Sequence, residues 1–355
     1  MSRIKTAIIG CGRNARELHT PILLRHPEFE VIGTYDLVAD RAESLANVFA
    51  HNGHNCKAFE SREALLASDV EYVVVLTDSH MHTEVAAACL RAGKNVLITK
   101  PWALDSEDAA FIIDEAKKTR DKFGVHLMPF LPQNWGTDLS TARELIESGA
   151  IGKVYEVRRR ASTFGKRYDW QLYKRCGGGY LNNWGPHLLG QVLDLVGEPI
   201  VKVYAETKQV IMDGDCEDMF QTIMKTESGI LIECEHAIMV DKLPHWIIQG
   251  DKGSIFITND MIDVHRISYP GPIDPAAYRS KTNDDNETYK LPGAYNGDRY
   301  AIYSHIADVI RGNCEYRVPL TFTRNLTAVC DAIHKSADTD EVVRLSVEDL
   351  SLIHI

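Results

Sequence analysis

The chain has 355 residues, of which 45% are hydrophobic and 25% charged, the balance of a water-soluble globular protein long enough for two domains. Its formal net charge of -11 argues against nucleic-acid and anionic-membrane partners, because both need clustered Lys and Arg. The sequence shows no signal peptide and no apolar run of about 20 residues, and its eight cysteines form no CxxC pair. We therefore expect a cytoplasmic protein with reduced thiols.

The first part of the chain alternates predicted strands and helices. The run EYVVVLT at Glu71–Thr77 is apolar throughout, as is typical of a parallel strand covered on both faces. Further strands are expected at Ile4–Ile9, Phe29–Tyr35, Asn95–Ile98 and Val125–Met128. Helices are expected from Asn14, over Asp40–Phe49, over His82–Ala92, and from Asp105 or Ser106 to Lys122. This alternation predicts a parallel sheet in an N-terminal domain over residues 1–125.

After about residue 150 the pattern changes to strands with short links, and turn signals occur at 227–229 and 251–253. The expected strands are Val154–Thr163, Val201–Ile211, Met219–Lys225, Gly229–Ala237, His245–Gln249 and Ser254–Thr258. Segment 266–299 is rich in Pro, Asn, Asp and Gly and is predicted to be a long loop, followed by helices near 300–311 and 321–337. We expect a second α/β domain over residues 126–355, with a mostly antiparallel sheet.

A glycine-rich turn follows the first predicted strand. Gly10, Cys11, Gly12, Arg13, Asn14 and Ala15 form the pattern GxGxxA between a strand and a helix. The first glycine allows a tight turn, the second lets a pyrophosphate approach the backbone, and Ala15 keeps the helix close to the sheet. The strand–turn–helix context raises a weak motif to a strong prediction of a dinucleotide site.

Asp36 closes the second predicted strand, 24 residues after Gly12. A carboxylate at that place can accept hydrogen bonds from the adenine-ribose hydroxyls of NAD, and it repels the additional phosphate of NADP. The pattern therefore predicts NAD as the cofactor. Arg41 leaves NADP open, since its charge can assist a 2′-phosphate.

Three further segments have distinctive sequences. Thr77–His82 reads TDSHMH, the run AGKNVLITKP ends in Lys100 and Pro101, and Gly177–Gly179 is followed by Leu181, Asn183, Gly185 and His187. Together they resemble the glucose–fructose oxidoreductase, inositol dehydrogenase and MocA family. The first is similar to that family's loop near the nicotinamide ribose, the second to its "AGKHV…EKP" segment and the third to its GGGxLxDxGxHxxD stretch. The resemblance covers nearly the whole chain.

The resemblance implies a Rossmann domain and an α/β domain with an open sheet that makes a homodimer or homotetramer. It also implies a sugar, inositol, polyol or related substrate, and cofactor contacts from Thr77, His82, Lys100 and Pro101. Three positions depart from the family pattern, because carboxylates are replaced by Thr99, Asn183 and Gly190. The cofactor side looks intact, whereas the substrate side has lost charge.

Lys100 and His187 are the predicted catalytic residues. Lys100 follows the fifth strand at its carboxyl end, where open α/β sheets bind ligands, and can hydrogen-bond the substrate hydroxyl. His187 is predicted to be the general acid/base, with Asn183 one helical turn earlier to orient it. Trp170, in a stretch of basic and aromatic residues, is expected to line the substrate site with these three. His80 and His82 lack a Cys or carboxylate cluster, so no metal is expected.

The sequence thus predicts an NAD-dependent oxidoreductase that acts on a carbohydrate, polyol or derivative. Two alternatives stay open at this point. One is redox-neutral chemistry, in which a sugar carbon is oxidised transiently during cleavage or epimerisation. The other is a cofactor-sensing regulatory protein without enzyme activity, which the lost carboxylates favour and which Lys100 and His187 oppose.

Overall fold

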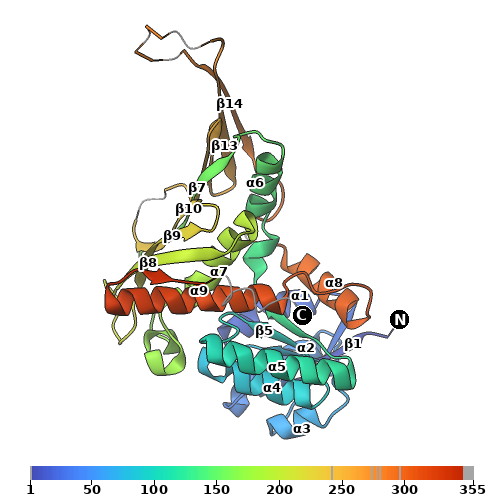
Figure 1. The fold of residues 1–355 in the computed structure, drawn as a ribbon. Coiled ribbons are helices and arrows are strands. Elements are labelled where there is room, and N and C mark those ends of the chain that lie inside the picture. Colours follow the sequence, from blue (N-terminus) through green and yellow to red (C-terminus); the bar gives the residue numbers. More distant parts are fainter. Residues whose placement is uncertain are drawn as a thin grey trace. The chain divides into compact units, whose positions relative to one another are not determined.

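The computed structural model describes residues 2–240, 243–272, 275–276, 278–279, 281–295 and 297–346 (Figure 1). The chain forms two compact units. The first unit contains Met1–Leu131, Asp169–Gly178 and Arg299–Ala328, and the second contains Pro132–Tyr168, Gly179–Asp298 and Val329–Ile355. A single domain boundary at residue 125 stays a prediction. Within the described part, no helix combines the length and the apolar character needed to cross a membrane.

The first unit contains a six-stranded parallel sheet in the order β3-β2-β1-β4-β5-β6. Its strands are β1 (Ile4–Ile9), β2 (Phe29–Tyr35), β3 (Lys57–Ala58), β4 (Tyr72–Val75), β5 (Asn95–Thr99) and β6 (Leu127–Phe130). This order confirms the predicted parallel sheet and places a topological switch point between β1 and β4, where sheets of this kind bind ligands. The strands β4 and β5 are almost entirely buried, which explains their unbroken apolar sequences.

Helices cover the sheet of the first unit. They are α1 (Thr20–Leu23), α2 (Ala39–His51), α3 (Arg62–Leu66), α4 (His82–Arg91), α5 (Ser106–Phe123) and α8 (Arg299–Ile310). Alternate residues of β1, β4 and β5, such as Ile9, Val75 and Ile98, pack in one core with α4 and α5. The helix expected from Asn14 is present, and it contains a π-helical turn, Ala15–His19, before it continues as α1.

The second unit contains a nine-stranded sheet in the order β14-β13-β12-β11-β7-β10-β9-β8-β15. Only β7 and β10 pair in parallel, so the expected, mostly antiparallel sheet is confirmed. The strands are β7 (Val154–Thr163), β8 (Ile200–Lys208), β9 (Met219–Thr226), β10 (Leu231–Ile238), β11 (Trp246–Gly250), β12 (Gly253–Thr258), β13 (Met261–Ser268), β14 (Asn283–Lys290) and β15 (Val343–Arg344).

One face of this sheet is covered and the other is open. In β9, Phe220, Thr222 and Met224 are buried, whereas Gln221 and Ile223 between them are exposed. The covered face carries α7 (Tyr180–Val196), which contacts β7, β9 and β10 and also α6 (Thr137–Glu147). The long helix α9 runs over Leu320–Thr339 (Figure 1).

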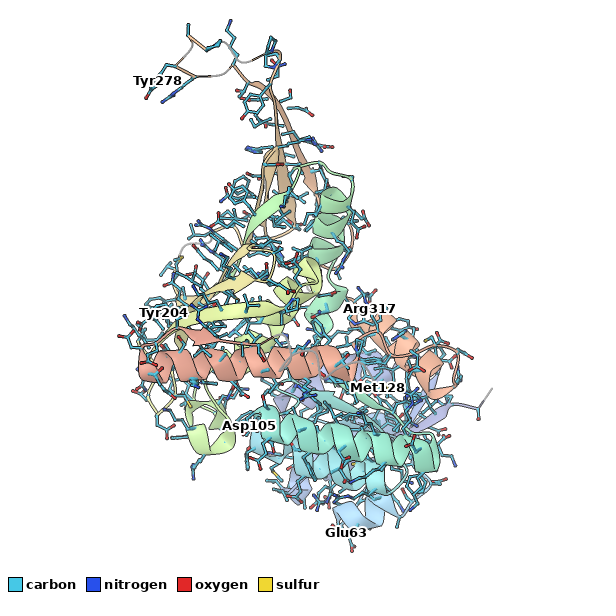
Figure 2. All side chains as sticks on the ribbon, in the orientation of Figure 1. Glu63, Asp105, Met128, Tyr204, Tyr278 and Arg317 are labelled. Atoms are coloured by element: carbon cyan, nitrogen blue, oxygen red, sulfur yellow. The ribbon has the colours of Figure 1, made fainter. Side chains whose placement is uncertain are left out.

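The predicted long loop over 266–299 is wrong in part, because β13 extends to Ser268 and β14 pairs with it. Strand β14 reads NDDNETYK, a composition that disfavours strands, but it is an exposed edge strand whose acidic groups meet Arg266. Residues 273–274, 277, 280 and 296 of the predicted loop lie outside the described residues. Figure 2 shows Tyr278, which is 95% exposed, beyond the end of this two-stranded ribbon.

His19 lies fully buried in the first unit, at the end of the π-helical turn. Its Nδ1 atom is 2.8 Å from the hydroxyl of Tyr303, and its ring packs against Phe130. This contact joins the segment that follows the glycine-rich turn to α8, which is almost 300 residues away in the chain. Burial lowers the pKa of His19 to about 3, so the imidazole stays neutral in the folded protein.

The buried His19 predicts loss of stability in acid. Because the pKa of an unfolded histidine is about 6.5, protons bind the unfolded chain below that pH and not the folded one. Between pH 7 and pH 5, His19 should remove about 2 kcal/mol from the free energy of unfolding. In urea titrations at both pH values, His19→Gln should abolish that part of the difference, whereas His51→Gln, at an exposed position, should preserve it. An equal difference in both variants would contradict the assignment.

Candidate active site

The glycine-rich turn lies at the switch point of the first-unit sheet. Gly10, directly after β1, has a φ of 93°, and a Cβ atom there would lie 2.6 Å from the carbonyl carbon of Leu76 after β4. A side chain is therefore excluded both by the left-handed backbone and by the neighbouring main chain. The turn packs directly on the end of β4, which brings its amide groups to the carboxyl edge of the sheet.

Asp36 is joined to the same turn. One carboxylate oxygen accepts a hydrogen bond of 2.7 Å from the backbone N–H of Cys11, and the other accepts one of 2.9 Å from Val38. The side chain of Cys11 is buried and donates to the carbonyl of Tyr35. Asp36 thus lies against the turn and orders it, in the position from which a carboxylate can meet a ribose.

The residues of this turn fit a dinucleotide. A Cβ atom at Gly12 would meet no protein atom within 4 Å, so there is open space in front of its backbone for a phosphate. The hydroxyl oxygen of Thr77 is buried and makes no hydrogen bond with any residue that the structure describes. Of the other predicted cofactor residues, Ala15 is buried, while Arg13, Asn14 and Arg41 are exposed. The guanidinium of Arg16 donates to the carbonyl of Arg41.

His82, at the start of α4, joins two strand-end segments. Its Nδ1 atom is 2.7 Å from the carbonyl oxygen of Pro101 and its Nε2 atom is 3.0 Å from that of Thr77. The ring is buried, and burial lowers its pKa although the two carbonyls oppose that shift. His82 therefore connects the backbones of Thr77 and Pro101. Lys100 follows β5 directly, is half-buried, and precedes Pro101 through a cis peptide bond.

The second unit supplies the predicted acid/base. His187 and Asn183 both lie in α7, four residues apart and thus on one side of the helix, and His187 is buried. The helix begins after Gly179, and Glu217 caps it by accepting the N–H of Leu181 at 3.0 Å. The expected helical relation between Asn183 and His187 is present, although the helix starts earlier than the apolar pattern at His187 indicates.

The three glycines before α7 are enclosed by protein atoms. A Cβ atom at Gly177 would lie 2.6 Å from the side chain of Leu104, and one at Gly178 would lie 2.4 Å from the carbonyl oxygen of Gln171. At Gly179, where φ is 97°, it would lie 2.3 Å from the carboxylate of Glu217. The glycines are explained by close packing within each unit, so they are not evidence for a ligand. Trp170 is half-buried in a short helical turn, Trp170–Leu172, of the first unit.

The structure adds aromatic neighbours of His187 that the sequence did not indicate. The ring of Trp184 lies edge-on to His187 at 6.3 Å and stacks on His236 of β10 at 5.5 Å. His236 is fully buried, and its burial lowers its pKa to about 4, so a neutral ring supports Trp184. The sequence could have indicated Trp184 only through its place in the helical turn between Asn183 and His187.

The positions that depart from the family pattern have their own contacts. The Thr99 hydroxyl is buried and donates to the carbonyl of Val75, where a carboxylate would be a buried charge. Gly190 offers its carbonyl to the side-chain amide of Asn134. The carboxylate of Asp194, also in α7, binds Asn134 at 3.1 Å and Arg143 at 2.9 Å. Asp194 therefore anchors the helix within the second unit.

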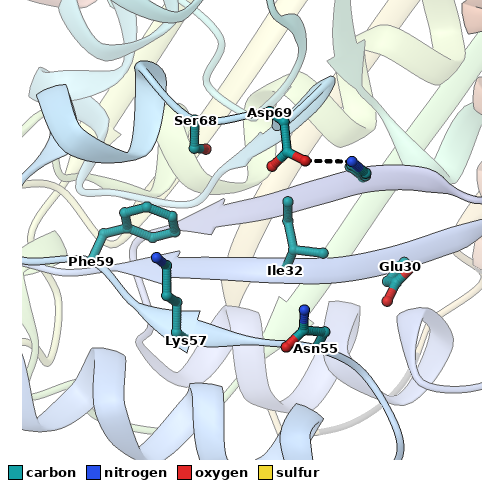
Figure 3. Close-up of a pocket in the computed structure, with 8 residues that line it drawn as sticks. Glu30, Ile32, Asn55, Lys57, Phe59, Ser68 and Asp69 are labelled. Atoms are coloured by element: carbon teal, nitrogen blue, oxygen red, sulfur yellow. Dashed lines mark hydrogen bonds and ion pairs between the residues drawn. The ribbon is translucent and has the colours of Figure 1, made fainter.

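A pocket in the first unit lies away from this site (Figure 3). It is found near the amino ends of the strands, whereas parallel sheets bind ligands at the carboxyl ends. Two cations and two anions line it, and two of these residues, Lys5 and Asp69, form an ion pair (dashed line at Asp69 in Figure 3). Its lining is Lys5, Glu30, Ile32, Asn55, Lys57, Phe59, Ser68 and Asp69. Across the part of the chain that the structure describes, no three His, Cys, Asp or Glu side chains are grouped to hold a metal ion.

Comparisons with known proteins match two parts of the chain to one oxidoreductase family. Residues 4–127 match an oxidoreductase family with an NAD-binding Rossmann fold, GFO/IDH/MocA, and residues 139–256 match the GFO/IDH/MocA C-terminal domain. An uncharacterized oxidoreductase of Schizosaccharomyces pombe is 30% identical over 72% of this chain and 70% of its own length. The scyllo-inositol 2-dehydrogenase (NADP(+)) IolW of Bacillus subtilis is 25% identical over 96% of both chains. A solved NAD-binding protein from Listeria innocua superposes with a TM-score of 0.83, at 28% identity and full coverage of both chains.

Two glycine variants separate folding from cofactor binding. Gly10→Ala should destabilise the first unit by about 1–3 kcal/mol, since the methyl group meets main-chain atoms and φ is left-handed. Gly12→Ala should preserve the melting temperature, because its methyl group meets no protein atom, yet weaken NAD binding at least roughly tenfold by occupying the space for the phosphate. Thermal unfolding and calorimetric NAD titration measure both effects. NAD affinity that is unchanged in Gly12→Ala would place the pyrophosphate elsewhere.

Proposed function

Since this chain belongs to the GFO/IDH/MocA family and is an NAD(P)-dependent oxidoreductase, we propose that its substrate is a sugar, inositol, polyol or a derivative of one. The main structural support for nicotinamide-dependent chemistry is the Gly10–Gly12 turn. It lies at the switch point of a parallel sheet, and Asp36 accepts a hydrogen bond from its backbone. The substrate class rests on relatives named scyllo-inositol 2-dehydrogenase and D-glucoside 3-dehydrogenase. The cytoplasmic location stays a prediction.

The proposed cofactor is NAD, held by the turn from Gly10 to Ala15, by Asp36 and by Thr77. The open space at Gly12 suits the pyrophosphate, and the Thr77 hydroxyl supplies a buried group that is ready for a hydrogen bond. Asp36 favours NAD over NADP, because a second phosphate on the ribose would meet its negative charge. When bound, the nicotinamide supplies the hydride acceptor or donor.

Lys100 and His187 are the proposed catalytic residues. The ammonium group of Lys100 donates a hydrogen bond to the reacting oxygen and thereby stabilises negative charge on it. The imidazole of His187 takes the hydroxyl proton during oxidation and returns it during reduction. Asn183 orients that imidazole without adding charge, and Trp170 is proposed to contact the substrate. The enclosed glycines do not support these roles, which rest on the position of Lys100 after β5 and of His187 in α7.

We also propose that the open face of the second-unit sheet joins copies of the chain into a homodimer or homotetramer. Several of its charges are already paired within one copy, as in Arg158 with Glu156 at 2.6 Å and Arg160 with Glu235 at 3.0 Å. On the same face, Ile223 and Leu231 are 51% and 46% exposed. A face with balanced charge and exposed apolar groups can pack on its own copy without repulsion.

A substrate screen tests the proposed function. Sugars, inositols and glycosides are incubated with enzyme and either NAD or NADP, and both reduced nicotinamide and released product are measured. The active substrate should be oxidised faster with NAD, and Lys100→Ala and His187→Ala should each lower turnover at least about 10²-fold. NAD affinity and thermal stability serve as the controls. Product without reduced nicotinamide would instead establish redox-neutral chemistry, and turnover that persists in His187→Ala would remove that residue from the mechanism.

The oligomer proposal has a separate test on the open face. Ile223→Glu places an unpaired charge among the exposed apolar groups and should convert the assembly to a smaller species in sedimentation velocity. The matched control is Val210→Glu, since Val210 is 54% exposed and lies outside the strands. An interface on this face would be contradicted if the protein without substitutions sediments as a monomer. It would also be contradicted if both variants sediment as the same species.

A further inference from the structure

We propose that Gln191 is a positioning residue for His187, and that it acts through a closed ring of buried side chains formed with Arg159, Asp138 and Trp246. The inference rests on the proposed catalytic role of His187. All four members of the ring, and His187 itself, belong to the second unit. They come from four elements, namely β7, α6, α7 and β11.

Both ends of the Gln191 amide are engaged. Its oxygen accepts two hydrogen bonds from Arg159, at 2.9 Å from Nε and 2.7 Å from Nη2. Its nitrogen donates to the carbonyl oxygen of Gln133 at 3.0 Å and to the carboxylate of Asp138 at 3.3 Å. The side chain is fully buried. An amide that lies between a guanidinium and a carboxylate has one sensible orientation, because the reverse would direct donors at donors.

Two further contacts close the ring. The indole nitrogen of Trp246 donates to the same carboxylate oxygen of Asp138 at 2.8 Å, and the guanidinium of Arg159 lies over the Trp246 ring at 4.9 Å. Arg159 also donates to the backbone carbonyls of Arg160 and His245. Burial opposes both charges, raising the pKa of Asp138 and lowering that of Arg159. Each of the two charges makes more than one hydrogen bond, and these bonds offset part of the cost of burying it.

The ring determines how α7 is rotated. Gln191 follows His187 by four residues, so the two side chains lie on one side of the helix, one turn apart. A rotation of α7 about its axis would break the bonds to Arg159, Asp138 and Gln133 together. The same rotation would swing the imidazole of His187, whose proton transfer depends on its direction. Gln191 thus holds the helix at the angle at which His187 is presented.

Asp194 offers a contrast on the same helix. It ties α7 to Asn134 and Arg143, but its side chain is partly exposed and it lies two turns from His187. Loss of that tie leaves the ring intact. If the ring, rather than anchoring in general, positions His187, the two sites should differ in their effect on turnover.

Two variants of Gln191 test the proposal on the active substrate identified by the screen. Gln191→Glu sets a second carboxylate against Asp138 and removes the donors, and kcat should fall about 10- to 100-fold, the cost of misplacing a catalytic group. Gln191→Met keeps the length of the side chain, removes its hydrogen-bonding groups and adds no charge, and kcat should fall by a similar factor. The KM for NAD should not change in either variant, because its proposed site lies in the first unit. Asp194→Asn should have a kcat close to that of the unchanged enzyme.

The outcomes separate this proposal from the proposed function. If His187→Ala abolishes turnover while folded Gln191→Glu keeps its kcat, the ring does not position His187 and the proposal is overturned. If His187→Ala retains turnover, the assigned mechanism fails, whatever the Gln191 variants do. Should Gln191→Glu fail to fold, Gln191→Met decides. A folded Gln191→Met with reduced kcat supports the positioning role. A folded Gln191→Met with unchanged kcat, or unfolding of both variants, overturns it.

Discussion

The cofactor half of this protein depends on one close contact, in which the backbone of Gly10 rests on the main chain at Leu76 and Thr77. That contact is available only to a residue without a side chain, and it brings the turn after β1 to the edge where β4 ends. Asp36 then accepts the N–H of Cys11, so the end of β2 joins the same edge. Three strand ends are thereby gathered at the switch point, and the position of a Cβ atom at Gly12 is left in open space.

In the second unit, the important constraint is the rotation of helix α7 about its axis where it packs on the sheet. Apolar packing of Leu181, Leu188 and Val192 keeps α7 on the sheet, but it tolerates small rotations because it is not directional. Hydrogen bonds between buried charges and a buried amide do not tolerate them. Apolar packing thus holds α7 on the sheet, and hydrogen bonds set its rotation. As a result two charged groups, Arg159 and Asp138, are buried in the unit that contains the proposed acid/base, although burial of a charge costs free energy.

Several residues that look functional in the sequence have structural explanations. The run Gly177–Gly179 is enclosed by Leu104, Gln171 and Glu217, and the two ring nitrogens of His82 lie within hydrogen-bond distance of two backbone carbonyls. Such roles still bear on function, since His82 holds the segments that contain Thr77 and Pro101. Conversely, Trp184 and Gln191 carry no motif, yet they lie beside or one turn from His187. Local pattern does not distinguish a residue that meets a ligand from one that shapes the backbone around it.

The sequence by itself determined the parallel sheet of the first unit, the glycine turn with Asp36, and the mostly antiparallel second sheet. These follow from short-range rules, because burial on both faces demands apolar strands and a left-handed turn demands glycine. The tertiary structure alone decided that β14 forms, since its acidic residues are strand-like only when paired with β13 and Arg266. It alone also decided that residues 299–328 join the first unit and that Gln191 meets Arg159 and Asp138. Those contacts join residues tens to hundreds of positions apart, and no local periodicity records them.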